Sequence, residues 1–99
     1  MGYTPIILDK TRNFRYGMKA ISLVEKKIGC SMGKIDFENM TMEDTAILLW
    51  AGLVHEDNKL TPDKVMELID EHSNITEAAK VMGEALNAAF GGKKEVKND

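Results

Sequence analysis

The feature that most constrains this chain is an apolar block at residues 46–54, Ala-Ile-Leu-Leu-Trp-Ala-Gly-Leu-Val. Nine residues are too few to cross a membrane, because a spanning helix needs about 20. A helix that is apolar on every side must instead be covered by neighbouring segments or by another protein. The whole chain has 99 residues, the size of a single domain. We therefore expect an all-α fold in which about four helices pack around this block.

Apolar residues at helical spacing predict that the first helix begins at Asn13. Its expected inner face consists of Phe14, Met18, Ile21, Val24 and Ile28. Gly29 follows in the position of a left-handed C-cap. Residues 30–40 mix polar and isolated apolar side chains, which indicates a loop with room for one short helical turn.

Capping signals predict where the next two helices begin. Thr41 and Asp44 approximate a capping box, so the helix that contains the apolar block is expected to start at Met42. Thr61 directly before Pro62 is a strong start signal for the following helix, which we expect to run to about residue 72.

The fourth helix is expected over residues 75–90, where apolar side chains keep a helical period until two glycines end it. Before the first helix, residues 1–12 contain a short β-favouring run after a proline and are expected to form an extended arm. Residues 13–91 then form the helical domain. Residues 92–99 form a charged tail that we expect to be disordered.

Composition argues against nucleic acid and against secretion. The net charge is −3, so the chain as a whole offers no source for the counterion release that drives nucleic-acid binding. Residues 75–83 resemble the first helix of a helix-turn-helix motif, but the apolar period continues past them and no basic recognition helix follows. The single cysteine, Cys30, cannot form an internal disulfide, which favours a reducing compartment and hence the cytoplasm.

We find no candidate catalytic, cofactor or metal site. Cys30 lies in no activated-thiol motif, and His55 and His72 are too isolated to define a zinc site. Residues 53–64 superficially resemble part of an EF-hand loop, but Lys64 stands where a bidentate glutamate is needed. The sequence therefore predicts a protein that is not an enzyme.

The features that suggest a function are the apolar surface and the many methionines. The chain has seven methionines, whose flexible side chains adapt to irregular partners. Four short helices cannot easily cover the apolar block on every side, so we expect part of it to contact another chain. The candidate partner-binding residues are Trp50, Leu53, Met42, Met66, Met82 and Phe90. For Trp50 and for each single methionine, packing in the core is the simpler interpretation, and it stays open at this point. A second candidate surface is the face of residues 75–90.

The order of these features resembles the tail assembly chaperones of long-tailed (siphovirus-type) phages and prophages. The resemblance covers roughly residues 5–91. It rests on Asn-Phe-Arg-Tyr-Gly-Met-Lys-Ala at 13–20, Leu-Val-Glu-Lys at 23–26 with Gly29, Leu-Leu-Trp-Ala-Gly-Leu at 48–53, Leu-Thr-Pro-Asp-Lys-Val at 60–65 and Leu-Ile-Asp at 68–70. The Leu-Trp-Ala-Gly-Leu block followed by Leu-Thr-Pro is its most specific part.

The resemblance implies a small, mostly helical protein without enzymatic activity or cofactors, present in the host cytoplasm and absent from the finished particle. Members of this family bind the tape measure protein, keep it soluble and help to recruit tail tube subunits. They also self-associate. Two alternatives stay open at this point: a small helical DNA-binding regulator built on residues 75–90, and a structural head–tail connector subunit.

Overall fold

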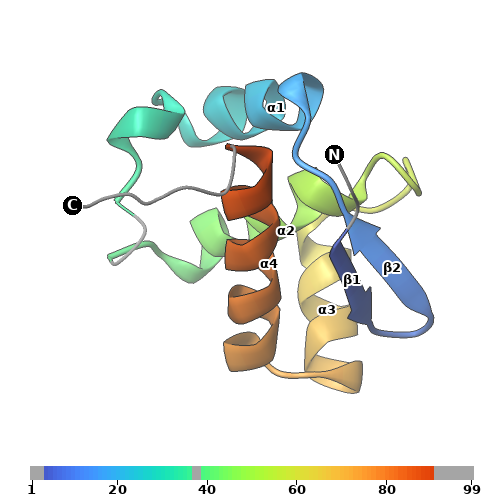
Figure 1. Ribbon diagram of the computed structural model, residues 1–99. Coiled ribbons are helices and arrows are strands. Elements are labelled where there is room, and N and C mark those ends of the chain that lie inside the picture. Colours follow the sequence, from blue (N-terminus) through green and yellow to red (C-terminus); the bar gives the residue numbers. More distant parts are fainter. Residues whose placement is uncertain (1–3, 37–38, 91–99) are drawn as a thin grey trace.

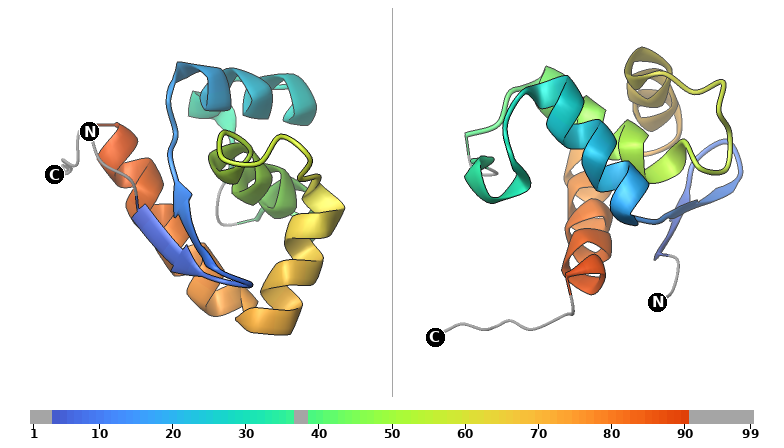
Figure 2. Two further views of the ribbon diagram at one scale, coloured as in Figure 1. Left: turned by 90° about the vertical axis from the view of Figure 1, so that its right-hand side faces the viewer. Right: turned by 90° about the horizontal axis from the view of Figure 1, so that it is seen from above.

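The computed structural model describes residues 4–36 and 39–90. Four helices make up most of it: α1 (Met18–Ile28), α2 (Met42–Leu53), α3 (Pro62–His72) and α4 (Ile75–Ala89). A short 3-10 turn, η1 (Met32–Lys34), follows α1. The described chain starts with an antiparallel hairpin of β1 (Thr4–Ile7) and β2 (Thr11–Phe14). The hairpin is labelled in Figure 1, and the left view of Figure 2 shows it packed against α4. The expected mainly helical fold of four helices is confirmed.

Helix α2 is the centre of the packing, as its apolar sequence requires. It contacts α1, α3, α4 and strand β2. Its side chains from residue 48 to residue 53 are all buried. The hairpin covers part of this helix through β2, and Trp50 and Leu53, which were expected to contact another chain, are buried. Ile47 and Val54 of the apolar block are only half-buried.

The first helix begins later than the sequence predicts. The predicted start at Asn13 is wrong, because residues 11–14 pair as a strand with residues 4–7, with Thr4 opposite Phe14 and Ile7 opposite Thr11. Alternate side chains at 12, 14 and 16 are buried, which is the period of a strand and not of a helix. Met18, expected on the inner face, is instead 91% exposed at the first position of α1.

The predicted capping residues cap the N-terminal ends of α2 and α3. The hydroxyls of Thr41 and Thr61 each accept a hydrogen bond, at 3.1 Å, from the backbone N–H three residues later. Asn74 caps α4 in the same way through its Oδ1 atom, at 2.8 Å from the N–H of Glu77. Gly29 ends α1 with φ of 93°, a left-handed conformation that glycine adopts without strain.

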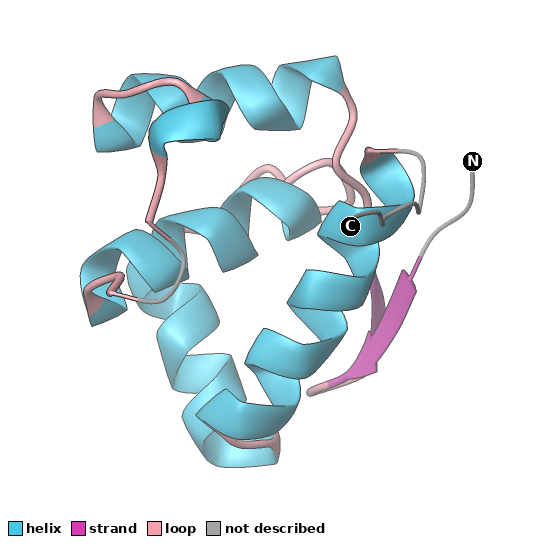
Figure 3. Cartoon of the chain, turned by 60° about the vertical axis from the view of Figure 1, so that its left-hand side comes forward, coloured by secondary structure: helices cyan, strands magenta, loops and turns pink. Residues whose placement is uncertain are grey.

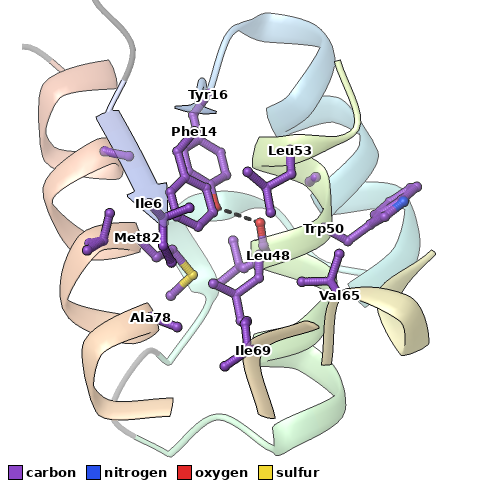
Figure 4. Close-up of a cluster of buried hydrophobic side chains, with 14 of the residues drawn as sticks. Ile6, Phe14, Tyr16, Leu48, Trp50, Leu53, Val65, Ile69, Ala78 and Met82 are labelled. Atoms are coloured by element: carbon purple, nitrogen blue, oxygen red, sulfur yellow. Dashed lines mark hydrogen bonds between the residues drawn. The ribbon is translucent and has the colours of Figure 1, made fainter. Parts of the chain in front are cut away.

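Two aromatic rings join the hairpin to α2. Phe14 and Tyr16 are both buried and stack with ring centroids 6.1 Å apart. The Tyr16 hydroxyl donates a hydrogen bond of 2.6 Å to the carbonyl oxygen of Leu48, drawn as a dashed line in Figure 4. This contact requires glycine at position 52, because a Cβ atom there would lie 2.6 Å from the Tyr16 ring and 2.8 Å from Phe14.

Polar contacts fasten the hairpin to the loop between α2 and α3. The backbone N–H and the side-chain Nδ2 of Asn13 each donate a hydrogen bond of 3.0 Å to the Glu56 carboxylate. His55 Nε2 donates to the carbonyl oxygen of Asn13 at 2.8 Å. We call Asn13, His55 and Glu56 the hairpin latch. The buried Arg12 guanidinium adds a two-bond contact with Asp9, at 2.9 Å for each bond.

The hairpin crosses the predicted boundary between the arm (1–12) and the helical domain (13–91), since β2 contains residues from both sides of it. The extended arm is therefore an integral part of the domain, with β1 packed on α4. The predicted tail at 92–99 lies outside the described residues. None of the helices in residues 4–36 and 39–90 is long and apolar enough to cross a membrane.

Candidate functional site

Most of the exposed apolar side chains gather around surface hollows. Five large apolar side chains of the described chain are exposed: Ile7, Met18, Met42, Ile75 and Phe90. All of these except Ile7 line one of three hollows on the helical face. Met42 and Phe90 are each 60% exposed, whereas methionine and phenylalanine side chains are usually buried in folded proteins.

Two of the hollows meet at Phe90, directly after the end of α4. The α1–α4 hollow, of about 420 Å³, lies between Met18 and Ile21 of α1 and Phe90. The α2–α4 hollow, of about 440 Å³, is lined by Met40 before α2 and by one face of α4 that includes Met82. Phe90 lines both, so its ring separates two adjoining apolar depressions.

The third hollow continues this surface toward α3. The α2–α3 hollow, of about 200 Å³, is lined by Met42, Met66 and Ile75, and it shares Thr45 with the α2–α4 hollow. We call the three linked hollows the methionine groove. Five methionines line it: Met18, Met40, Met42, Met66 and Met82. Four of them lie on the four helices shown in Figure 3, and Met40 lies in the loop before α2.

The sequence of α4 explains why one wall of the groove is shallow. Its groove-lining residues Ala79, Met82, Gly83 and Leu86 follow helical spacing, so they share one face. Two of them are alanine or glycine, and a Cβ atom added at Gly83 would meet nothing within 4 Å. Small residues on this face leave the space that a partner side chain can enter.

Two of the predicted partner-binding residues belong to the core. Leu53 has no exposed surface, and Trp50 is buried with its Nε1 donating a 2.8 Å hydrogen bond to the carbonyl oxygen of Leu60. The Lys27 ammonium lies over the Trp50 ring, 5.8 Å from its centroid, in a cation–π contact. Neither side chain lines the methionine groove, so we remove both from the candidate surface.

The other four predicted residues lie together in the groove. Met42 and Phe90 are exposed, Met66 is half-buried, and Met82 is buried but lines the groove floor. Sequence reasoning missed Met18 as a contact residue because it placed this side chain on the inner face of a longer helix. The switch to a two-residue period before residue 17 was the signal that would have corrected this.

The groove has a carboxylate at each end. Asp70 lines the α2–α3 hollow. At the other end, the Glu25 carboxylate lines the α1–α4 hollow and accepts a 3.0 Å hydrogen bond from the N–H of Met32, which ties η1 to α1. The groove thus combines an apolar floor with charged edges, the arrangement expected of a protein-binding surface.

No group of three or more histidine, cysteine, aspartate or glutamate side chains could hold a metal ion in the part of the chain that the structure describes. The buried ionisable groups have structural partners instead. Burial raises the pKa of Tyr16 well above its ordinary value of 10.0, and its hydroxyl is engaged by Leu48. The residues that line the groove offer apolar contact and, at Glu25 and Asp70, negative charge.

Comparison with known proteins adds no relative to this description. No family model, no curated protein and no solved structure matches the chain. The groove and the sequence resemblance are the two observations that bear on the function of this protein.

Proposed function

We propose that this chain is a tail assembly chaperone that covers apolar helical segments of the tape measure protein while a phage tail is built. The observation that carries the proposal is the methionine groove, which gathers on one linked surface four of the five large apolar side chains that are exposed within residues 4–36 and 39–90. The sequence resemblance supplies the identity of the client. In this proposal the protein acts in the host cytoplasm, associates with further copies of itself and helps to recruit tail tube subunits.

The groove suits a client that exposes many different helices. Methionine side chains are unbranched and polarisable, so they adjust to apolar stripes of differing shape at low cost. An amphipathic helix presents such stripes at i, i+3, i+4 and i+7. A surface of this kind binds many related segments with moderate affinity, which is what keeping a long helical protein soluble requires.

The test is co-expression with the large helical protein encoded just downstream of this chain in its own genome. We expect the large protein to become soluble and to co-elute with several copies of this chain in size-exclusion chromatography. If it stays insoluble and this chain elutes alone, the chaperone proposal fails. The same preparation addresses the alternatives, because a connector subunit would be found in purified particles and a DNA-binding regulator would bind a duplex with steep salt dependence.

A further inference from the structure

The charges of this chain are divided unevenly along its length. Residues 4–36 contain seven lysines and arginines and three carboxylates. Residues 39–90, which include α2, α3 and α4, contain ten carboxylates and three lysines. The end of the methionine groove that lies between α2 and α3 is therefore set in the acidic part of the molecule.

Four carboxylates border that end of the groove. Asp70 lines the α2–α3 hollow itself. Glu43, Asp44 and Asp63 line an adjoining hollow of about 330 Å³, which shares Ala46 and Met66 with the α2–α3 hollow. None of the four side chains forms an ion pair with any residue of the described chain.

Helix capping accounts for only part of this arrangement. Glu43, Asp44 and Asp63 lie in the first turns of α2 and α3, where the helix dipole favours negative charge. Asp70 lies near the C-terminal end of α3, where the dipole disfavours a carboxylate. Lys27, which also lines the adjoining hollow, sets one positive charge against these four carboxylates. The residues that line the two hollows therefore carry a net negative charge.

We propose that the segment bound at the α2–α3 end of the methionine groove is an amphipathic helix whose apolar stripe is flanked by lysine or arginine. The inference rests on the proposed function, since it takes the groove to cover helices of a client. Met42, Met66 and Ile75 receive the apolar stripe, while the carboxylates on either side of Met66 meet the basic flanks. Charge pairs at such a rim speed association and select among partners of equal hydrophobicity.

The experiment compares three synthetic peptides of about 18 residues, long enough to form helix in isolation. They share one leucine stripe at helical spacing and carry lysine, glutamine or glutamate on its flanks. Fluorescence anisotropy of labelled peptide then reports the affinity for the full chain. We expect the lysine peptide to bind about tenfold more tightly than the glutamate peptide at low salt, and the difference to shrink at about 0.5 M salt.

A variant pair separates the rim charges from net charge. In Glu43→Lys/Asp70→Lys two of the four border carboxylates become lysines, which cancels the net charge of these four positions, and we expect the lysine peptide to bind about tenfold more weakly. The control Glu71→Lys/Glu84→Lys makes the same change in net charge at exposed positions that line none of the hollows described above, and should shift the affinity less than about twofold. The neutral pair Glu43→Gln/Asp70→Asn, which introduces no cation into the first turn of α2, should give an intermediate loss.

Each contrary outcome has a distinct meaning. Equal binding of all three peptides would overturn the charge inference and leave the groove as a general helix-binding surface. An equal loss in the control variant would also overturn it, because net charge alone would then explain the preference. Binding of none of the peptides would overturn the inference together with the groove's part in the proposed function.

Discussion

Position 52 shows at the scale of one residue how closely the hairpin approaches α2. Gly52→Ala places a Cβ atom under 3.0 Å from two packed aromatic rings, so we expect the free energy of unfolding to fall by about 1–3 kcal/mol. Gly83→Ala is the matched control in a helix, since its Cβ meets nothing within 4 Å and alanine favours helix by up to about 1 kcal/mol. Urea denaturation measures both; a neutral Gly52→Ala would contradict the packing described.

The buried Tyr16 hydroxyl makes a second residue-scale prediction, on pH. Tyr16→Phe loses the hydrogen bond to Leu48 and should destabilise the protein by about 1 kcal/mol at neutral pH. Burial raises the pKa of Tyr16 in the folded state above the ordinary 10.0, so the unfolded chain releases this proton first. The stability that Tyr16 contributes is complete below pH 10.0 and falls as the pH rises above it.

The measurement is the free energy of unfolding of both proteins between about pH 8 and pH 11.5. The native protein should lose stability more steeply above pH 10 than Tyr16→Phe, so that the gap between the two curves closes. Parallel curves over this range would show that the hydroxyl is not buried as described.

At the scale of elements, the helices were predictable and the hairpin was not. Capping residues such as Thr41 and Thr61 act within one turn, so their effect can be read from a few neighbouring residues. The hairpin depends on contacts distant in sequence, with Asn13 bonded to Glu56 and Tyr16 to Leu48. Phe14 and Met18 are four residues apart, a spacing that also fits a helix. The secondary structure around Phe14 therefore stays ambiguous until those contacts are known.

We expect the hairpin latch to control the local stability of the hairpin. Glu56→Ala removes both hydrogen bonds to Asn13, and we expect the amides of residues 11–14 to exchange hydrogen faster while α3 keeps its protection. The exposed Glu71→Ala should leave exchange in the hairpin unchanged. Faster exchange throughout the domain would show that the latch stabilises the whole molecule and not the hairpin alone.

The latch also has a pH dependence. Partial burial acts to raise the pKa of Glu56, but the hydrogen bonds from Asn13 lower it overall below the ordinary 4.5. Arg12 similarly holds the pKa of Asp9 at about 2. Both carboxylates therefore stabilise the fold above about pH 4.5, and this stability is lost as the pH falls. We therefore expect the protection factors of the hairpin amides, which are corrected for the intrinsic exchange rate at each pH, to fall between about pH 4.5 and pH 3 before those of α3 do.

For the whole molecule, the fold class was predictable because an apolar central helix leaves few ways to pack a chain of this length. The candidate site was only half predictable. Exposure depends on which faces the other elements cover, and Trp50 and Leu53 were candidates that the structure places in the core. The loop before α3 and helix α1 enclose Trp50, which the local sequence pattern does not specify. Met42 and Phe90 stay exposed at helix ends, where fewer neighbours exist to bury them.

In the proposed function, the methionine groove is the surface that keeps a client helix soluble. The variant Met42→Gln/Phe90→Ser changes two exposed groove residues and should alter the free energy of unfolding by no more than about 0.5 kcal/mol each. The control Ile7→Gln changes an exposed apolar side chain that lines none of the three hollows.

The decisive measurement is the soluble fraction of the co-expressed tape measure protein with the native chain and with each variant. We predict that the native chain and Ile7→Gln keep it soluble, while the folded Met42→Gln/Phe90→Ser variant leaves most of it in the pellet. Full solubility with the folded groove variant would contradict the claim.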